Sequence, residues 1–511
     1  MADHAGHCSS SSQDRRSHFL VAAYGYQGHL NPALALARSL ARPHGGGARV
    51  TLSVAASAHA RMFPSSPPDQ LVVSPPDAEV SDGVISYVPY SDGFDFGARP
   101  RTAADRARRR RVSAASLSAI VRRLAAAGRP VTCVVSVLLL PAADVAVEHG
   151  IPLAVFWNQS AATLAAYYHY FHGHEHLVAA AAAAYVGGAD DPASVTLPGL
   201  PPLRVRDLPS FLVDATGGEH ARASIDSMRG LLEIVGREKP MVLVNTIDML
   251  EPEAVALRAM RQQHLEVFAV GPMLPRLQLL QQTDAAGDDE GRRMDLYEQD
   301  DEKGYTEWLD ARPRRSVVYV SYGSMLGYSR QQVQEMLRGL RECRRPYLWV
   351  VPRDGRDGDV ERCLMEMDDD DGDGERGMVM EWCDQLKVLA HPSTGCFVTH
   401  CGWNSMLEAL VFGVPMVAVP NWSDQPVNAH LVEELGVGVR AERDAAGLLV
   451  GTELAKFIAV VTGDGDEGMN IRNRASLLKD KARKEVIESG LTESRLQKFV
   501  NAMQNSTSSE I

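Results

Sequence analysis

His29 is the first residue of the chain whose type and position predict chemistry. It stands in the sequence YQGHLNP, directly after the apolar run HFLVAAYG that begins at His18. Such a run is typical of a buried parallel strand, and residues that follow the carboxyl end of such a strand face the ligand-binding edge of the sheet. A neutral imidazole can take a proton near neutral pH, so we expect His29 to be a general base. The structural alternative is a loop histidine that is hydrogen-bonded only to backbone.

A second group of polar residues follows the apolar run GCFVT, in the sequence HCGWNSMLEALVFG that begins at His400. This pattern predicts a strand, a turn and the start of a helix. The free amides and partial positive charge of a helix N-terminus suit a diphosphate, and His400, Asn404 and Ser405 add donors to it. Ser324, in the turn that ends the run SVVYVSYGS, would approach the phosphates from the side. Ser405 and Glu408 also fit a helix capping box, which is a purely structural alternative.

Two successive alternations of predicted strands and helices would position these residues. The first contains the runs HFLVAAYG, ARVTLSVA, PVTCVVSVLLL, IPLAVFW and MVLVNT, and the second contains SVVYVSYGS, RPYLWVV and GCFVTH. Asn31 is the expected N-cap of the first helix, with Pro32 at its first position. An α/β chain of this kind predicts two doubly wound Rossmann-like domains that face each other across a central cleft.

The boundaries follow from changes in composition along the chain. We predict a disordered tail over residues 1–17, an N-terminal domain over 18–272 and an acidic linker over 273–304. A C-terminal domain then covers 305–485, and residues 486–511 form a helix that packs back across the domains before a loose, Ser-rich end.

Composition excludes several other classes of protein. The 511 residues carry a net charge of −13, which gives no general attraction for nucleic acid or an anionic membrane. Seven scattered cysteines without a CxxC pair favour reduced thiols, and the first 17 residues contain no apolar stretch typical of a signal peptide. No apolar run approaches the length of a membrane span. We therefore expect a cytoplasmic monomer without stable membrane insertion.

Three conspicuous patterns are better explained without a ligand. The histidines at 172, 174 and 176 resemble a metal site but stand in a polar segment. Asp369–Gly374 begins like a calcium loop, but its twelfth position is Met380 instead of glutamate. The basic run Arg106–Arg111 reads as a solvated helix face in an acidic protein. We predict no metal, no cofactor and no nucleic acid.

The stretch from Trp382 to Gln425 resembles the signature box of the plant family 1 UDP-glycosyltransferases, which have the GT-B fold. It reads WCDQLKVLAHPSTGCFVTHCGWNSMLEALVFGVPMVAVPNWSDQ, and PGLPPLRVRDLPSFL, VNTIDMLEPEA and VVYVSYGS add to the resemblance. The similarity is greatest to the branch that glucosylates indole-acetate, crocetin and anthocyanin 5-hydroxyls. The resemblance implies inverting transfer of glucose from UDP-glucose to the hydroxyl or carboxyl of a small lipophilic plant metabolite, with the acceptor bound by the N-terminal domain.

The same resemblance assigns the nucleotide contacts. Trp382 would stack on the uracil, the backbone of Cys383 would read its edge, Gln385 would assist, and Glu408 would accept the ribose hydroxyls. The implied phosphate contacts are those of His400, Asn404 and Ser405.

The sugar contacts come from both predicted domains. Asp424 and Gln425 can bond sugar hydroxyls, and Gln425 at the final position resembles glucose users rather than galactose users. By the family pattern, Trp403 adds a further contact to the sugar. Trp157 and Asn158 stand at positions where members of the family contact the sugar or the phosphates.

One position departs from the family pattern. An aspartate after the CVV strand usually balances the charge of the histidine, but Val137 stands there, and Asp144 reads as a structural helix residue. Loss of the partner weakens stabilisation of the imidazolium, so we expect a carboxylic acid or an acidic phenol as acceptor. The alternative is a UDP-sugar-binding protein with little catalysis, although His29 argues for an enzyme. A nicotinamide dehydrogenase would need a GxGxxG that the first strand lacks.

Overall fold

The structure of the protein is a computed structural model. It describes residues 17–43, 46–64, 78–96, 100, 102–188, 191–213, 219–248, 250–251, 256–274, 304–324, 327–365, 376–444, 446–485 and 490–508. The predicted N-terminal tail up to residue 16, nearly all of the linker, and the Asp369–Gly374 pattern lie outside the described residues.

The first domain is built on an eight-stranded sheet of order β10-β9-β6-β5-β1-β2-β4-β3. Neighbouring strands are parallel except β3, which pairs antiparallel with β4. Its strands are β1 (His18–Ala23), β2 (Arg49–Ala55), β3 (Val80–Ser81), β4 (Ser86–Tyr90), β5 (Cys133–Val137), β6 (Leu153–Trp157), β9 (Met241–Val244) and β10 (Val267–Ala269). A separate two-stranded ribbon consists of β7 (Ser194–Val195) and β8 (Leu203–Arg204).

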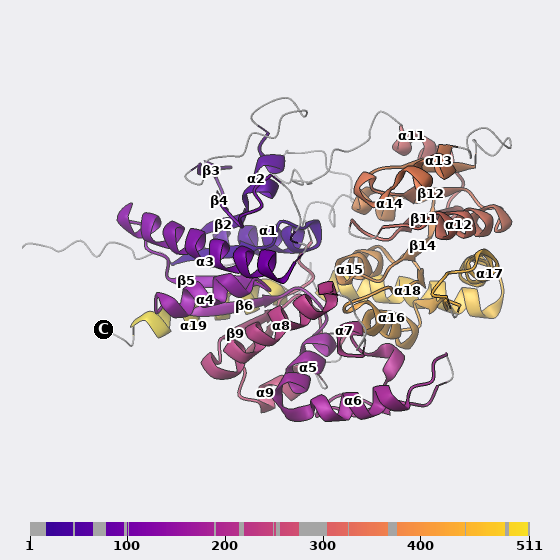
Figure 1. Ribbon diagram of the computed structural model, residues 1–511. Helices are drawn as coiled ribbons and strands as arrows, with labels where there is room; N and C mark the ends of the chain where they lie inside the picture. The colour runs from indigo at the N-terminus through magenta and orange to yellow at the C-terminus, as the bar shows by residue number, and fades with distance from the viewer. Residues whose placement is uncertain are drawn as a thin grey trace, which may run out of the picture.

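The second domain has a six-stranded, fully parallel sheet of order β13-β12-β11-β14-β15-β16. Its strands are β11 (Val317–Ser321), β12 (Tyr347–Val350), β13 (Gly377–Met380), β14 (Thr394–Thr399), β15 (Met416–Ala418) and β16 (Gly438–Arg440). The prediction of an α/β protein with two doubly wound sheets is confirmed (Figure 1).

Helices cover both faces of each sheet. Those of the first domain are α1 (Gln27–Ala41), α2 (Ala56–Met62), α3 (Ala103–Ala126), α4 (Leu140–Glu148), α5 (Ala161–His169), α6 (Glu175–Ala184), α7 (Ser210–Val213), α8 (Glu219–Glu238) and α9 (Ala256–Gln262), with a π-helical turn (Tyr170–His174) and a 3-10 turn (Val205–Asp207). Those of the second are α11 (Tyr305–Asp310), α12 (Arg330–Glu342), α13 (Gly358–Met365), α14 (Gln385–Ala390), α15 (Trp403–Phe412), α16 (Gln425–Glu434), α17 (Gly451–Thr462) and α18 (Asp466–Arg483), with a 3-10 turn (Arg353–Gly355).

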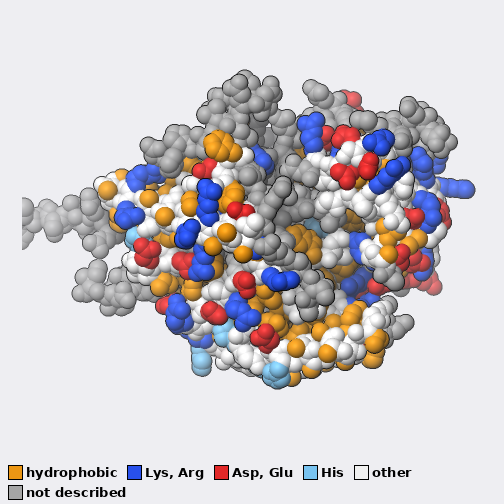
Figure 2. Space-filling model, in the orientation of Figure 1, with side chains coloured by type: hydrophobic (Ala, Val, Ile, Leu, Met, Phe, Trp, Pro, Cys, Tyr) orange, Lys and Arg blue, Asp and Glu red, His pale blue; other side chains and the backbone are white. Residues whose placement is uncertain are grey.

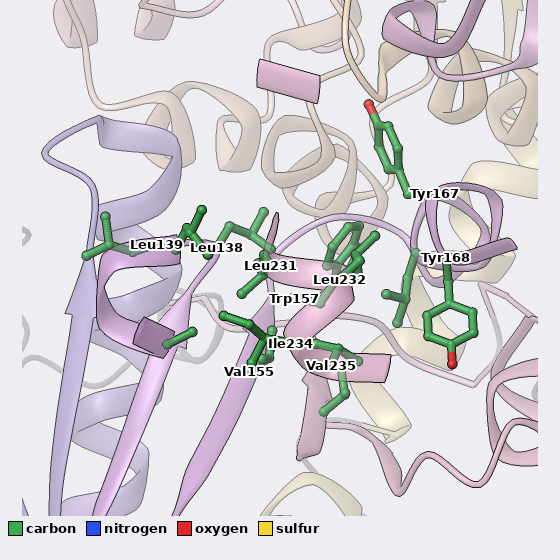
Figure 3. Close-up of a cluster of buried hydrophobic side chains, with 14 of the residues drawn as sticks. Leu138, Leu139, Val155, Trp157, Tyr167, Tyr168, Leu231, Leu232, Ile234 and Val235 are labelled. Carbon is green, nitrogen blue, oxygen red and sulfur yellow. The ribbon is translucent and has the colours of Figure 1, made fainter. Parts of the chain in front are cut away.

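The two faces of the first sheet form separate cores, which is why its strands read as continuous apolar runs. Along β1, Leu20 and Ala22 belong to the cluster under α3, α4, α5, α8 and α9, whereas Phe19 and Val21 belong to the cluster under α1 and α2. Figure 3 shows part of the first cluster, including Trp157.

The last described helix, α19 (Leu491–Ser508), returns to the first domain after the second is complete (Figure 1). Phe499 packs against Phe19 of β1 with ring centroids 5.6 Å apart. Arg495 donates to the carbonyl of Ala269 at the end of β10, over 3.0 Å. The helix continues to Ser508. The loose, Ser-rich end that we expected therefore does not begin before Ser508.

Charges are mixed on the surface. On the face shown in Figure 2, basic and acidic side chains are interspersed over both domains. The basic run Arg106–Arg111 lies on α3, where Arg110 pairs with Asp144 at 3.0 Å. Among the described residues, no helix is both long and apolar enough to cross a membrane.

Candidate active site

The order of strands brings the predicted site residues to the edge of each sheet where the chain reverses direction. In the first sheet the chain runs from β1 outward through β2 and β4, and then returns to β5 on the other side of β1. In the second sheet it runs from β11 through β12 and β13 and returns to β14. His29 follows β1, Ser324 follows β11 and His400 follows β14, so all three lie at a switch point, where doubly wound sheets bind ligands.

His29 lies in the first turn of α1, not in a loop before it. The carbonyl of Tyr26 accepts the backbone N–H groups of His29 and Leu30, each over 2.9 Å, and so starts the helix at Gln27. The prediction that Asn31 is the N-cap of this helix is therefore wrong, because Tyr26 occupies that position. Pro32 is buried inside the helix rather than at its first position.

The proline has a direct consequence for the carbonyl of Gly28. In an α-helix the N–H of residue i donates to the carbonyl of residue i−4, and Pro32 has no N–H to give to Gly28. Two side-chain amides take its place: Nδ2 of Asn158 donates to this carbonyl over 3.1 Å and Nδ2 of Asn404 over 2.7 Å. Asn158 belongs to the first domain and Asn404 to α15 of the second. The two domains therefore meet one residue from His29.

The surroundings of the His29 imidazole keep it neutral. Tyr24 contacts the ring edge-on with centroids 5.5 Å apart, and the guanidinium of Arg109 lies 5.3 Å from the Tyr24 ring and 5.8 Å from that of Tyr26. Burial lowers the pKa of His29 to about 4, and the positive charge of Arg109 acts in the same direction. The backbone of Val137 acts in the opposite direction without restoring the ordinary value.

No carboxylate is among the groups that shift the pKa of His29 in the described part of the chain. Asp92 pairs with Arg109 over 2.8 Å, and Asp144 pairs with Arg110 at the surface. Val137 is completely buried. Among the residues that the structure describes, none therefore replaces the aspartate that the family pattern places at this position.

On the second domain, Gln385 links Glu408, which is expected at the ribose, to Ser405, which is expected at the phosphates. Its Nε2 donates to Oγ of Ser405 over 2.9 Å and to Oε2 of Glu408 over 2.7 Å, while its Oε1 accepts from the Tyr319 hydroxyl over 3.1 Å. Tyr319 was missed from the sequence because it lies inside β11, where the pattern shows only a buried strand. The network orients the carboxylate of Glu408 and the hydroxyl of Ser405.

The capping-box interpretation of Ser405 and Glu408 is wrong. Helix α15 begins at Trp403, with Gly402 as its N-cap, so Ser405 is the third residue of the helix and cannot cap it. The helix N-terminus itself is where the sequence places it, directly after the turn that follows β14.

His400 lies in a narrow space between two glycine-containing turns. A Cβ on Gly323 would approach its Nε2 to 2.8 Å, and one on Gly402 to 2.5 Å, so only glycine fits at both positions. Burial lowers the pKa of His400 to about 4, partly opposed by the backbone of Ser321. A neutral imidazole with one N–H can donate to a phosphate at the start of α15. Ser324 follows Gly323 in the facing turn and is partly exposed.

Trp382 and Cys383 lie between β13 and α14. Trp382 is partly exposed, as a ring that stacks on a base must be. Cys383 is buried, and its Sγ lies 3.6 Å from the Tyr319 hydroxyl, so only its backbone is placed to read a base edge.

The two remaining tryptophans expected at the sugar have structural side chains. Trp157 is fully buried in the core of Figure 3, and its indole donates to the carbonyl of Ser160 over 3.0 Å. Trp403 is also buried and donates to the carbonyl of Asn245 in the first domain over 2.7 Å. Neither side chain offers a surface for a sugar contact, because the indole N–H of each is already used.

Asp424 and Gln425 are buried at the start of α16. Asp424 accepts from Nδ2 of Asn428 over 2.7 Å, and burial raises the pKa of its carboxyl to about 6. Oε1 of Gln425 accepts the backbone N–H groups of Asn421 and Trp422 over 2.9 and 3.1 Å. The amide NH2 of Gln425 is therefore the end that is left to donate to a ligand oxygen.

An ionic cluster between the domains was not predicted. Fully buried Asp207 accepts from Arg204 of its own domain and from Arg440 of the second domain, both over 2.7 Å. Arg206 pairs with Glu442 across the same interface. The sequence signal for this cluster is the dense run of charges in LRVRDLPSFL, whose partners lie more than two hundred residues away in the chain.

The histidines near residue 172 are bonded to their own helical segment. Nδ1 of His172 donates to the carbonyl of Tyr168 over 2.7 Å, and its ring stacks on that of Tyr168 with centroids 4.0 Å apart. Nδ1 of His174 donates to the carbonyl of His169 over 3.2 Å. In the described part of the chain, no group of three or more His, Cys, Asp or Glu residues could hold a metal ion.

Comparisons with known proteins agree with this geometry. The family model described as UDP-glucoronosyl and UDP-glucosyl transferase matches residues 292–484. Chloroplastic crocetin glucosyltransferase of Gardenia jasminoides is 38% identical over 498 residues, covering 95% of this chain and 97% of that protein. Anthocyanidin 3-O-glucoside 5-O-glucosyltransferase 1 of Perilla frutescens is 37% identical over 493 residues, covering 95% and 98%. The crystal structure of Os79 from O. sativa in complex with UDP superimposes with a TM-score of 0.73 at 28% identity, covering 95% of this chain and 100% of that chain.

Proposed function

The chain belongs to the UDP-glycosyltransferase family, and from that premise we propose that it transfers glucose from UDP-glucose to a small lipophilic plant metabolite. The observation that carries the proposal is the carbonyl of Gly28, which joins Asn404 at the N-terminus of α15 to the turn that holds His29. A phosphate seat and a base are thereby held on opposite sides of one junction. The names of relatives, which mention crocetin and anthocyanidin glucosides, support a small carboxylic acid or a phenol as the acceptor.

The mechanism is a single displacement at the anomeric carbon with inversion. His29 faces the attacking acceptor, and the oxygen of the acceptor forms the new bond as the bond to UDP breaks. The negative charge that develops on UDP is stabilised by the N-terminus of α15, with donors from His400 and Ser405. Trp382 holds the base, and Gln385 and the carboxylate of Glu408 hold the ribose. Positioning within the domain junction supplies much of the rate.

The acceptor is a carboxylic acid in preference to a phenol or an alcohol. With a pKa of about 4, His29 is a weak base, and it has no carboxylate partner to stabilise its charged form. A phenol near pKa 10 lies about six units above it, which corresponds to about 8 kcal/mol for the proton transfer. A carboxylic acid is ionised at neutral pH and needs no base at all. Its product is a glucose ester.

A matched acceptor pair tests this proposal. Cinnamic acid and cinnamyl alcohol differ only at the group that attacks, and UDP release with mass analysis of the product measures both. We expect turnover of the acid, and His29→Ala should lower kcat/KM for it less than tenfold. For any phenol that is accepted, the same substitution should lower kcat/KM at least a hundredfold. Activity confined to alcohols would refute the acceptor class. Binding of UDP-glucose by calorimetry without UDP release from any acceptor would favour the alternative, a sugar-nucleotide-binding protein.

The donor and the absence of a cofactor are part of the same proposal. Gln425 at the end of the box supports glucose, so UDP-glucose should give a higher kcat/KM than UDP-galactose. The phosphate seat is built from protein donors, so activity should persist in excess EDTA. A requirement for a divalent metal would contradict this account of how UDP leaves.

We also propose a cytoplasmic monomer. The cysteines in the described ranges are free thiols, which suits a reducing compartment, although one relative is named as chloroplastic. Fractionation of a tagged protein tests the compartment, and light scattering coupled to gel filtration tests the mass.

A further inference from the structure

The loop that carries Asp424 and Gln425 is held from the other domain. The backbone N–H of Ser423 donates to Oγ of Ser210 over 2.7 Å, and the backbone N–H of Ser210 donates to the carbonyl of Ser423 over 2.9 Å. Ser210 is the first residue of α7 in the first domain, while Ser423 directly precedes Asp424. This reciprocal pair is independent of the contacts that hold the nucleotide.

Ser423 needs such a restraint because of its backbone conformation. Its φ is +62°, in the left-handed region that is unfavourable for residues with a Cβ. Such a residue keeps this conformation only where its surroundings determine it. Here both its N–H and its carbonyl are bonded to one residue of the facing domain.

Two neighbouring contacts come from the same side. The ring of Phe211 meets that of Trp422 edge-on with centroids 6.0 Å apart. The hydroxyl of Tyr167, on α5, is hydrogen-bonded to the Ser423 side chain. Figure 3 shows Tyr167 pointing away from the leucine cluster, in the opposite direction to Tyr168. Residues of the first domain thus flank the loop on either side of Ser423.

Ser423 lies in the chain between Asn421 and Trp422, whose N–H groups hold Gln425, and Asp424 at the start of α16. Gln425 accepts two backbone N–H groups from the loop through Oε1, so its amide turns with the loop backbone. Asp424, which directly follows Ser423, has its carboxylate fixed by Asn428. By contrast, Trp382 and Gln385 belong to the segment from β13 to α14, and Gln385 is bonded to Tyr319, Ser405 and Glu408 of its own domain.

We propose that Ser210 is a positioning residue for the transferred sugar, which acts from the acceptor domain by holding Ser423 in its left-handed conformation. Asp424 and Gln425 are then aimed at the hydroxyls of glucose only when the two domains are joined. The inference rests on the proposed function, and it adds that recognition of the sugar depends on the contact between Ser210 and Ser423, whereas recognition of UDP does not depend on this contact.

The test compares binding of UDP-glucose with binding of UDP. Ser210→Ala removes one hydrogen bond to the loop, and we expect KM for UDP-glucose to rise about fivefold to tenfold, the usual effect of one such bond. The Kd of UDP, measured by calorimetry, should stay within about twofold. Ser210→Thr keeps the oxygen and should restore KM, and Ser194→Ala is a matched control at an exposed serine of the same domain. An equal change for UDP and UDP-glucose, or no change in either, would overturn the proposal.

A second variant tests whether Ser210→Ala acts through the backbone strain at Ser423 or through a general disturbance of the fold. Glycine adopts the left-handed region without penalty, so Ser423→Gly should need less restraint from Ser210. In a Ser423→Gly background, Ser210→Ala should raise KM by no more than about twofold. A full effect in that background would contradict the role assigned to strain. If no acceptor is glucosylated, the Kd of UDP-glucose replaces KM, so failure of the proposed activity remains distinguishable from failure of this inference.

Discussion

Pro32→Ala tests whether the site depends on a carbonyl that the helix leaves free. In the structure, the carbonyl of Gly28 accepts from Asn158 and Asn404 because Pro32 has no N–H to donate to it. Alanine would restore that N–H. The helix would then offer Gly28 a third donor, in competition with the amide that joins the two domains.

The change in stability should be small, because three effects nearly cancel. Proline inside a helix is about 3 kcal/mol less favourable than alanine. Pro32 is buried, and loss of two buried CH2 groups costs about 1.6 kcal/mol. Alanine also gives the unfolded chain more freedom, at a cost of about 0.4–1 kcal/mol. We expect the free energy of unfolding in urea to rise by about 0–1 kcal/mol.

Activity should fall although stability does not. A carbonyl has two lone pairs, and both are used by Asn158 and Asn404. Loss of one hydrogen bond of ordinary strength, about 1 kcal/mol, corresponds to about fivefold in kcat/KM. The measurement is kcat/KM for UDP-glucose at saturating acceptor.

A double variant controls for unrelated effects of the proline. Since Asn158→Ala removes one of the two competing donors, its combination with Pro32→Ala should cost less than the product of the single effects. Unchanged kcat/KM in Pro32→Ala, or simple multiplication in the double variant, would refute the idea that the free carbonyl of Gly28 matters.

Three further predictions follow from buried polar groups. Trp403→Phe leaves the carbonyl of Asn245 without its donor and should lower the free energy of unfolding in urea by about 1–3 kcal/mol; no change would show that water replaces the indole. The pKa of Asp424 is about 6 and that of His29 is about 4. As the pH falls below about 6, kcat/KM for UDP-glucose should decrease, because Asp424 gains a proton while His29 is still neutral. A decrease that begins only near pH 4 would contradict this assignment. Because the pKa of Asp424 is raised, this group should also favour folding more as the pH falls from about 6 towards its unfolded value. The carboxylate of Glu251 accepts the N–H groups of Ala161 and Ala162 at the start of α5. Glu251→Gln replaces one of these oxygens by an NH2 group and should lower the free energy of unfolding by about 1–3 kcal/mol. An unchanged Tm would show that the helix is capped in another way.

The sequence predicted the long central strands and missed the shortest strands. Runs such as HFLVAA and GCFVT are buried on both faces, and their composition alone indicates a parallel strand. The three-residue strands β10, β15 and β16 are too short to show a period, and they form only because a neighbour offers backbone partners.

Candidate site residues could be placed where polar residues directly follow a strand. His29, Ser324 and His400 do lie after β1, β11 and β14, at the switch points of the two sheets. The partners that fix the site, Ser210 and Asn245, come from the other domain, and one sequence does not contain that information. The start of α1 was misplaced for a local reason, because proline is common at the first position of a helix but here lies inside one.

Val137 stands where the family pattern has an aspartate, and this departure explains only part of the environment of His29. The sequence reveals that a carboxylate is missing, but it does not reveal that Arg109 lies on the tyrosines beside His29. Burial, which is the largest cause, and the charge of Arg109 both lower the pKa of this imidazole. Mutation of Arg109 alone would leave burial as the largest cause, so the histidine would still be a weak base. A weak base favours an acceptor that is already ionised, and this is the physical reason for the acceptor class proposed above.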